Sequence, residues 1–149
     1  MDNDRFIHIL FSSEGDTVLP KEYADILFWI SFLIGFTAIY ALIKKKYDIS
    51  VICFVIFITS LNYWREPKTG FRRNIDIVAV ILGFIYLFSR AIMLNIQSLV
   101  FWICCTAVML TYAMSWVSYG YGYVFESTIV HCLVHLFGNA TAILYCSSL

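Results

Sequence analysis

The sequence predicts an all-α, polytopic integral membrane protein, a bundle of about five transmembrane helices. Hydrophobic residues make up 61% of its 149 residues and charged residues only 13%, whereas a soluble domain has about 25% charged residues. The apolar residues also form unbroken runs close to the length of about 20 residues that a helix needs to cross the hydrocarbon core. These runs lack the alternating pattern of barrel strands. Ten basic residues balance ten acidic ones, so no net charge favours binding to nucleic acid.

Each predicted helix is an apolar run bounded by charged or turn-forming residues. Three lysines follow the first run, Arg65 ends the second, Pro67 and Gly70 predict a turn before the third, and a Tyr- and Gly-rich stretch separates the last two. Residues 1–22 form a polar N-terminal segment, and residues 23–149 form a single transmembrane domain. The predicted helices cover 24–43, 49–64, 74–94, 98–116 and 124–146.

The distribution of basic residues favours an orientation in the membrane. The side that holds the N-terminus carries more basic residues than the opposite side, so the positive-inside rule favours a cytosolic N-terminus. The basic residues counted on the first side are Arg5, Lys21, Arg65, Lys68, Arg72 and Arg73, and those on the second are Lys44, Lys45, Lys46 and Arg90.

A few polar side chains fall within the predicted helices. An ionisable group inside a bilayer costs about 2.5–3.5 kcal/mol, so each one is a candidate functional residue. The second helix ends, and the third and fifth begin, on the same side of the membrane. Ser60, Asp76, His131 and His135 are therefore expected in one half of the bilayer, in one polar pocket if these helices pack together.

The fifth helix has a polar ridge with a spacing of four residues. Ser127, His131, His135 and Asn139 share one face, and Gly138 beside them is expected to let a neighbouring backbone approach closely. Two His at positions i and i+4 can bind one Zn²⁺ ion. We expect His131 and His135 as zinc ligands.

The acid on the third helix completes this hypothesis. Asp76 is the candidate for a third ligand or for the base that orients a zinc-bound water, and Ser60 would help to position or activate that water. A packing role is equally compatible with the sequence, since polar residues hydrogen-bond between membrane helices and Asp76 could pair with Arg72 or Arg73. A proton or ion path along Asp76 and the two His is a third interpretation.

The loop before the third helix is basic and is expected near the mouth of the pocket. Its side chains could bind a phosphate or a lipid headgroup, although basic residues also commonly flank membrane helices without binding a ligand. The candidate residues are Arg65, Lys68, Arg72 and Arg73.

The segment from His131 to His135, followed by Gly138, resembles the last-helix motif of the membrane hydrolase superfamily that includes alkaline ceramidases and adiponectin/progestin receptors. That superfamily has a Ser-x-x-x-His on an early helix, an Asp at the start of the next, and a His-x-x-x-His on the final helix. Its three His bind zinc, and its members act on lipid amides. Ser60 and Asp76 match the first Ser and the Asp in the same order along the chain.

The chain departs from this pattern at one zinc ligand and in its helix count. Trp64 stands where the family has its first His, and about five helices are predicted where the family has seven. The resemblance implies a reduced or inactive member, in which Asn62 or Asp76 would have to replace the missing ligand.

Three functions stay open from the sequence. The first is a zinc-dependent hydrolase-like site acting on a lipid amide or ester. The second is a non-enzymatic scaffold that assembles with itself or a partner. The third is a small channel or transporter subunit that surrounds a polar path as a homo-oligomer. Membrane lipids are the expected partners in each case.

Overall fold

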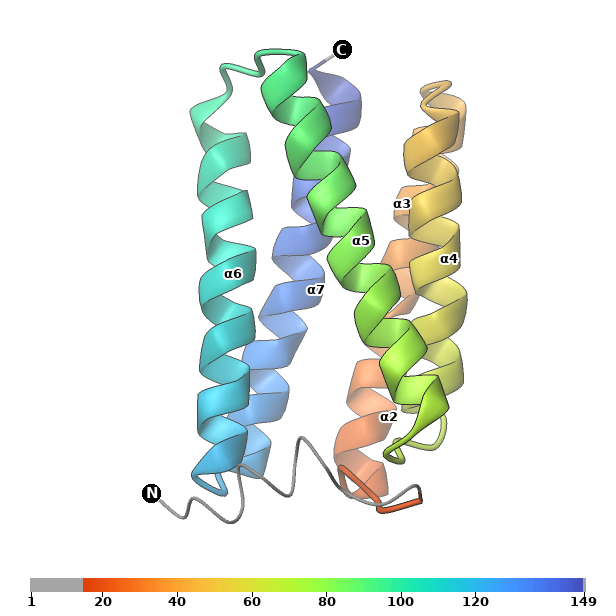
Figure 1. Ribbon diagram of the computed structural model, residues 1–149, viewed down its shortest axis with the longest axis vertical. Helices are drawn as coiled ribbons and strands as arrows, with labels where there is room; N and C mark the ends of the chain where they lie inside the picture. The colour runs from red at the N-terminus through yellow and green to blue at the C-terminus, as the bar shows by residue number, and fades with distance from the viewer. Residues whose placement is uncertain (1–14, 149) are drawn as a thin grey trace.

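In the computed structural model, which describes residues 15–148, every regular element longer than a single bridge is an α-helix (Figure 1). Five helices are long and apolar enough to cross a membrane, with α2 and α3 together forming the first. The predicted fold class is confirmed to this extent. The helices are α2 (Lys21–Ile30), α3 (Phe32–Ile43), α4 (Tyr47–Trp64), α5 (Phe71–Met93), α6 (Leu99–Gly120) and α7 (Val124–Ser147).

Among the helix boundaries that differ from the predicted ones, two lie beside turn glycines. The third long helix begins at Phe71, directly after Gly70, whose φ of 116° suits the preceding turn. The fourth continues to Gly120, four residues beyond the predicted end at Trp116, and the chain then turns at Gly122 with a φ of 86°. The aromatic stretch that was predicted as a connection is therefore largely helical.

The first membrane-length helix is interrupted at Ser31, which separates α2 from α3. The Ser31 hydroxyl donates a 2.7 Å hydrogen bond to the carbonyl oxygen of Leu27, one turn earlier. A serine bonded back in this way competes with the helical hydrogen bonds and often bends a helix.

Successive membrane-length helices run in opposite directions, whereas α3 and α7 also pack together and run in the same direction (Figure 1). The most extensive pairing joins α6 and α7, followed by α3 with α4 and α4 with α5, while α5 has only a small contact with α7. The α4–α5 pair is joined near one end by the Tyr86 hydroxyl, which donates to Asp48 at 2.6 Å. Thr59 and Ser60 join it near the other end by donating to Asp76.

The glycines within the helices have two different roles. A Cβ at Gly83 would lie 2.8 Å from Ile56 Cδ1, and one at Gly35 would lie 3.2 Å from the Phe57 ring, so both glycines allow close packing. The expectation for Gly138 is wrong. A Cβ there would have no described atom within 4 Å, because this position faces open space inside the bundle.

The segment before α2 lies along the loop between α4 and α5, at the lower end of Figure 1. The Val18 amide donates to the Pro67 carbonyl at 2.8 Å, and Thr17 forms an isolated bridge with Lys68. The expected grouping of these two segments at one end of the bundle is therefore confirmed for the described residues. Most of the predicted polar segment 1–22, including Arg5, lies outside the described residues.

Candidate functional site

The centre of the bundle contains a cavity of about 570 Å³. Most of its wall is aliphatic or aromatic and comes from α4, α5, α6 and α7. Ser60, Asp76, His131 and His135 all belong to this wall. The expectation that the three helices bring these polar residues to one pocket is thus fulfilled.

Asp76 lies on α5, one turn after the start of the helix, and faces α4. Its side chain is buried, with the whole residue only 6% exposed. Asp76 Oδ1 accepts a 2.7 Å hydrogen bond from the Ser60 hydroxyl and a 2.9 Å bond from the Thr59 hydroxyl. Two consecutive hydroxyls of α4 therefore hold the carboxyl group in place.

The two histidines are in ring contact with each other, and His131 also contacts an aromatic residue of α4. The ring centroids of His131 and His135 are 5.4 Å apart, and the centroid of the Trp64 ring lies 5.3 Å from that of His131. Ser115 Oγ lies 3.5 Å from His131 Nδ1. Within the described residues, His135 Nε2 and Trp64 Nε1 are buried and have no hydrogen-bond partner.

The residues do not fit the zinc site that we expected. No group of three or more His, Cys, Asp or Glu side chains that could hold a metal ion occurs among the described residues. His131 and His135 are neighbours, but Asp76 does not join them in such a group, and its Oδ1 atom accepts hydrogen bonds from the hydroxyls of α4. Asn62, the other candidate substitute for the missing ligand, is exposed and lies outside the cavity wall.

The two ends of the polar ridge on α7 take part in helix packing. Ser127 Oγ donates to the Ser115 carbonyl at 2.9 Å, and Ser115 Oγ donates to the Ser127 carbonyl at 3.1 Å, which ties α6 to α7. Asn139 accepts a 2.5 Å hydrogen bond from Thr37 of α3 and donates to the His135 carbonyl. The packing interpretation of the sequence therefore accounts for these two residues.

The basic side chains in and after the loop do not share one set of contacts. Glu66 forms ion pairs with Lys68 at 2.5 Å and with Arg72 at 3.3 Å, and these cations hold the pKa of the exposed Glu66 carboxyl below its usual range. Arg73 instead lines the cavity, and its guanidinium lies 5.5 Å from the centroid of the Trp116 ring. Arg65 is exposed. The four residues thus do not form a single headgroup site.

Sequence reasoning missed the aromatic part of the cavity wall. Trp64, Tyr112 and Trp116 line the cavity, and the Tyr112 ring lies 6.3 Å from His131. Aromatic residues near helix ends are typical of membrane interfaces, so the residue type alone did not indicate that these side chains point into the bundle. A spacing of four residues between Tyr112 and Trp116 on α6 was the available signal.

No family model, no curated protein and no solved structure matches the chain. The resemblance to the membrane hydrolase superfamily therefore stays a prediction that rests on a few residues.

Proposed function

We propose that the chain is a multi-pass membrane protein that holds a lipid-like molecule, with an apolar tail and a hydrogen-bonding head, in its central cavity. Insertion into a bilayer is supported by the outer surface of the helices, where large apolar side chains such as Trp29, Phe36 and Leu82 are strongly exposed. Apolar surface on this scale is typical of contact with hydrocarbon and is rare in soluble monomers.

One observation carries the proposal: a single cavity joins apolar walls to a buried polar cluster. Its volume of about 570 Å³ lies within the range of about 300–1,000 Å³ common for small-molecule sites. Ile52, Val80 and Val134 are among the apolar wall residues, whereas Asp76 and His135 provide polar groups. An amphiphile has the same division between apolar and polar parts.

The unpaired polar atoms favour a ligand over a purely structural cluster. A buried polar group without a partner costs about 1–3 kcal/mol, and His135 Nε2 and Trp64 Nε1 have none within the described residues. The hydroxyl or carbonyl oxygen of a ligand is a suitable partner for such groups. The scaffold interpretation explains Ser127 and Asn139 but leaves these two atoms without a role.

Binding is also better supported than zinc-dependent hydrolysis. A catalytic zinc site uses three protein ligands, and the described residues offer a pair of imidazoles without a third ligand beside them. We therefore assign no reaction step to Ser60 or Asp76. Their hydrogen bond is assigned to the architecture of the cavity.

Filling the cavity tests the proposal. Gly138 lines the cavity and has space for a side chain, so Gly138→Leu should occupy part of the volume without disturbing the fold. Protein purified in mild detergent would be extracted with solvent, and the retained lipid measured by mass spectrometry. We expect about one lipid per chain in the wild type, in line with the volume of this cavity, and a clear loss in Gly138→Leu.

A substitution on the outer face is the matched control. Leu136 lies on α7 close to Gly138 and is exposed on the outer side, so Leu136→Phe should retain the same lipid as the wild type. Equal retention by all three proteins would contradict binding in the cavity, because annular lipid on the outer surface would then account for the measurement.

A further inference from the structure

We infer that the ligand enters the cavity sideways from the bilayer, between α5 and α6, and that it is a long-chain amphiphile dissolved in the membrane. This inference rests on the proposed function and specifies the source of the ligand. Three features carry it: the exposure of residues that line the cavity, the side-chain contacts that border the gap, and the closure of both water-facing ends.

Some cavity residues are also exposed on the outer surface. Ile81 and Ile85 of α5 are 48% and 57% exposed, Met109 of α6 is 60% exposed, and all three line the cavity. Their chain neighbours Leu82 and Leu110 are 61% and 59% exposed but lie outside the cavity wall. The cavity therefore reaches the surface at Ile81, Ile85 and Met109, which we call the mouth.

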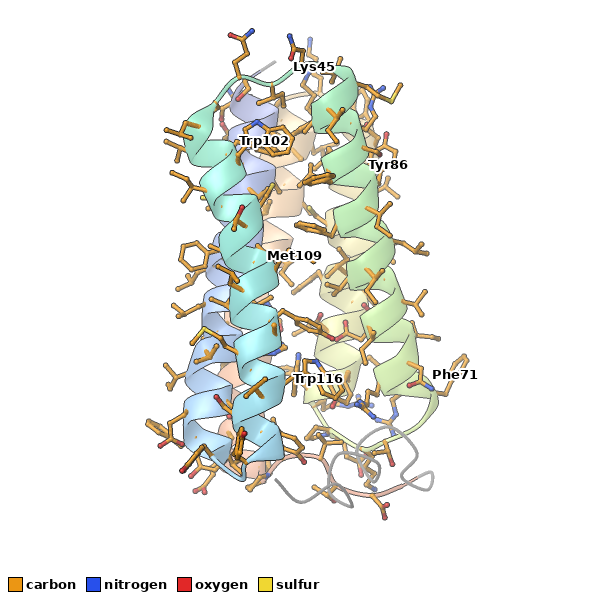
Figure 2. All side chains as sticks on the ribbon, turned by 60° about the vertical axis from the view of Figure 1, so that its left-hand side comes forward. Lys45, Phe71, Tyr86, Trp102, Met109 and Trp116 are labelled. Atoms are coloured by element: carbon orange, nitrogen blue, oxygen red, sulfur yellow. The ribbon has the colours of Figure 1, made fainter. Side chains whose placement is uncertain are left out.

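Two side-chain contacts between α5 and α6 border the mouth. At one end the Arg73 guanidinium lies over the Trp116 ring, at 5.5 Å from its centroid. At the other end the Phe88 and Trp102 rings meet with centroids 5.4 Å apart. Figure 2 shows this side of the molecule, with Trp102, Met109 and Trp116 in order along α6. The mouth thus lies between the helix ends, at the depth of the hydrocarbon layer if the bundle spans a bilayer.

The segment before α2 covers one water-facing end of the cavity. Val18 and Leu19 line the cavity at that end, and Leu19 is buried. The Val18 carbonyl accepts a 2.7 Å hydrogen bond from the Tyr119 hydroxyl, while its amide donates to Pro67. Side chains and backbone bonds therefore tie this segment across the bundle.

A packed core fills the opposite end. Ala41, Ala91, Phe101 and Tyr145 are almost fully buried in one hydrophobic cluster, and none of these four residues lines the cavity. A molecule arriving from water would have to displace this core or the covering segment. A molecule already dissolved in the bilayer would meet only the side chains of the mouth.

The chemistry of the mouth indicates the class of ligand. Its three residues are aliphatic or thioether side chains, which suit the passage of a hydrocarbon tail and penalise a charged group that has lost its water. Met109 is flexible and can change rotamer to admit a chain. We therefore expect a single-chain amphiphile whose tail enters through the mouth.

Photolabelling at the mouth tests this route. The full-length protein in phosphatidylcholine nanodiscs would receive palmitic acid with a mid-chain diazirine, and labelled residues would be mapped by mass spectrometry over time. In the wild type we expect labelling of inner cavity residues such as Val108 and Val134. Ile81→Trp combined with Met109→Trp should slow that labelling about tenfold, as expected when association requires a conformational change.

Two control proteins separate the possible outcomes. Leu82→Trp combined with Leu110→Trp adds the same bulk beside the mouth and should leave the labelling rate unchanged. Thr69 lies outside the cavity wall, and its amide bonds to the Asp16 carbonyl of the covering segment, so Thr69→Pro loosens the water-facing cover and should also leave the rate unchanged. Faster labelling in the second control, with no effect of the mouth variant, would overturn lateral access but keep the cavity as a binding site. Absence of inner labelling in the wild type would overturn the proposed function itself.

Discussion

The Ser60 hydroxyl donates a 2.7 Å hydrogen bond to Asp76 Oδ1 across the interface of α4 and α5. Both residues are buried, with Ser60 only 1% exposed. Together with the bond from Thr59, this contact fixes the polar end of the cavity. Its contribution to the free energy of unfolding can be measured without any ligand.

Removing the Ser60 hydroxyl should destabilise the bundle. Ser60→Ala deprives the buried carboxyl group of one of two donors, at a cost of about 1–3 kcal/mol in the free energy of unfolding. Asp76→Asn should cost less than Asp76→Leu, because the amide oxygen can still accept both hydrogen bonds. Unfolding in mixed detergent micelles measures these differences.

Ser89→Ala is the control for that series. Ser89 is exposed and bonds only to the Tyr86 carbonyl of its own helix in the described hydrogen bonds, so its loss should change stability little. If Ser60→Ala and Ser89→Ala lowered the free energy of unfolding equally, the hydrogen bond between Ser60 and Asp76 would not stabilise the fold more than an exposed one does.

Two Gly→Ala substitutions should change stability in opposite directions. Gly138→Ala adds a methyl group in open space and removes the helix penalty of glycine, which is about 0.5–1 kcal/mol, so the melting temperature should rise. Gly83→Ala would place its Cβ 2.8 Å from Ile56 and 2.9 Å from Ile52, and overpacking of this kind costs about 1–3 kcal/mol. A melting temperature that rose equally in both variants would contradict the assigned packing.

The ion pairs of Glu66 should make a pH-dependent contribution to stability. The Lys68 and Arg72 cations lower the pKa of Glu66 in the folded protein, so the stabilisation is present above the unfolded pKa of the group. It is lost as the pH falls through the lowered folded pKa. The difference in melting temperature between the wild type and Glu66→Gln should therefore be small at neutral pH, shrink in acid, and shrink in high salt. A melting-temperature difference that grew on acidification would contradict the stabilisation of the ionised Glu66 carboxylate by these cations.

Metal removal should leave the fold intact. Among the described residues, the two imidazoles of α7 have no third ligand in place, so dialysis against a chelator should not change the melting temperature. His131→Ala should lower it by removing ring contacts with Trp64 and Tyr112. A large loss of stability on chelation, restored by zinc, would instead support the site that the sequence suggested.

The fold could be predicted from the sequence because the residues within and beside each segment are enough to identify it as a membrane-length helix. Long apolar runs and their flanking charges located all five membrane-length helices. The break at Ser31 was not predicted, because a serine within an apolar run gives no sign of whether it bonds back to its own helix. The extension of α6 was missed since aromatic residues suit both a helix end and an interfacial loop.

The candidate site was predicted only in part. The order of the helices determines how deep each residue lies in the membrane, but it does not determine how each helix is rotated about its own axis. Topology correctly placed Ser60, Asp76 and His135 at one cavity. It could not determine that the Asp76 carboxyl group bonds to α4 and forms no metal-binding group with the two histidines among the described residues. Gly138 shows the same limit. A glycine on a helix allows a close helix contact if it faces a neighbouring helix, but it leaves open space if the helix is rotated so that it faces a cavity.

Quenching of Trp64 fluorescence tests the central claim most directly. A variant with Trp29, Trp102 and Trp116 changed to Phe keeps only Trp64, which is buried and lines the cavity. In bilayers of phosphatidylcholine with brominated acyl chains, a hydrocarbon chain in the cavity should quench its emission, and adding Gly138→Leu should restore the emission. Equal Trp64 emission in brominated and ordinary bilayers would contradict the presence of a lipid chain inside the bundle.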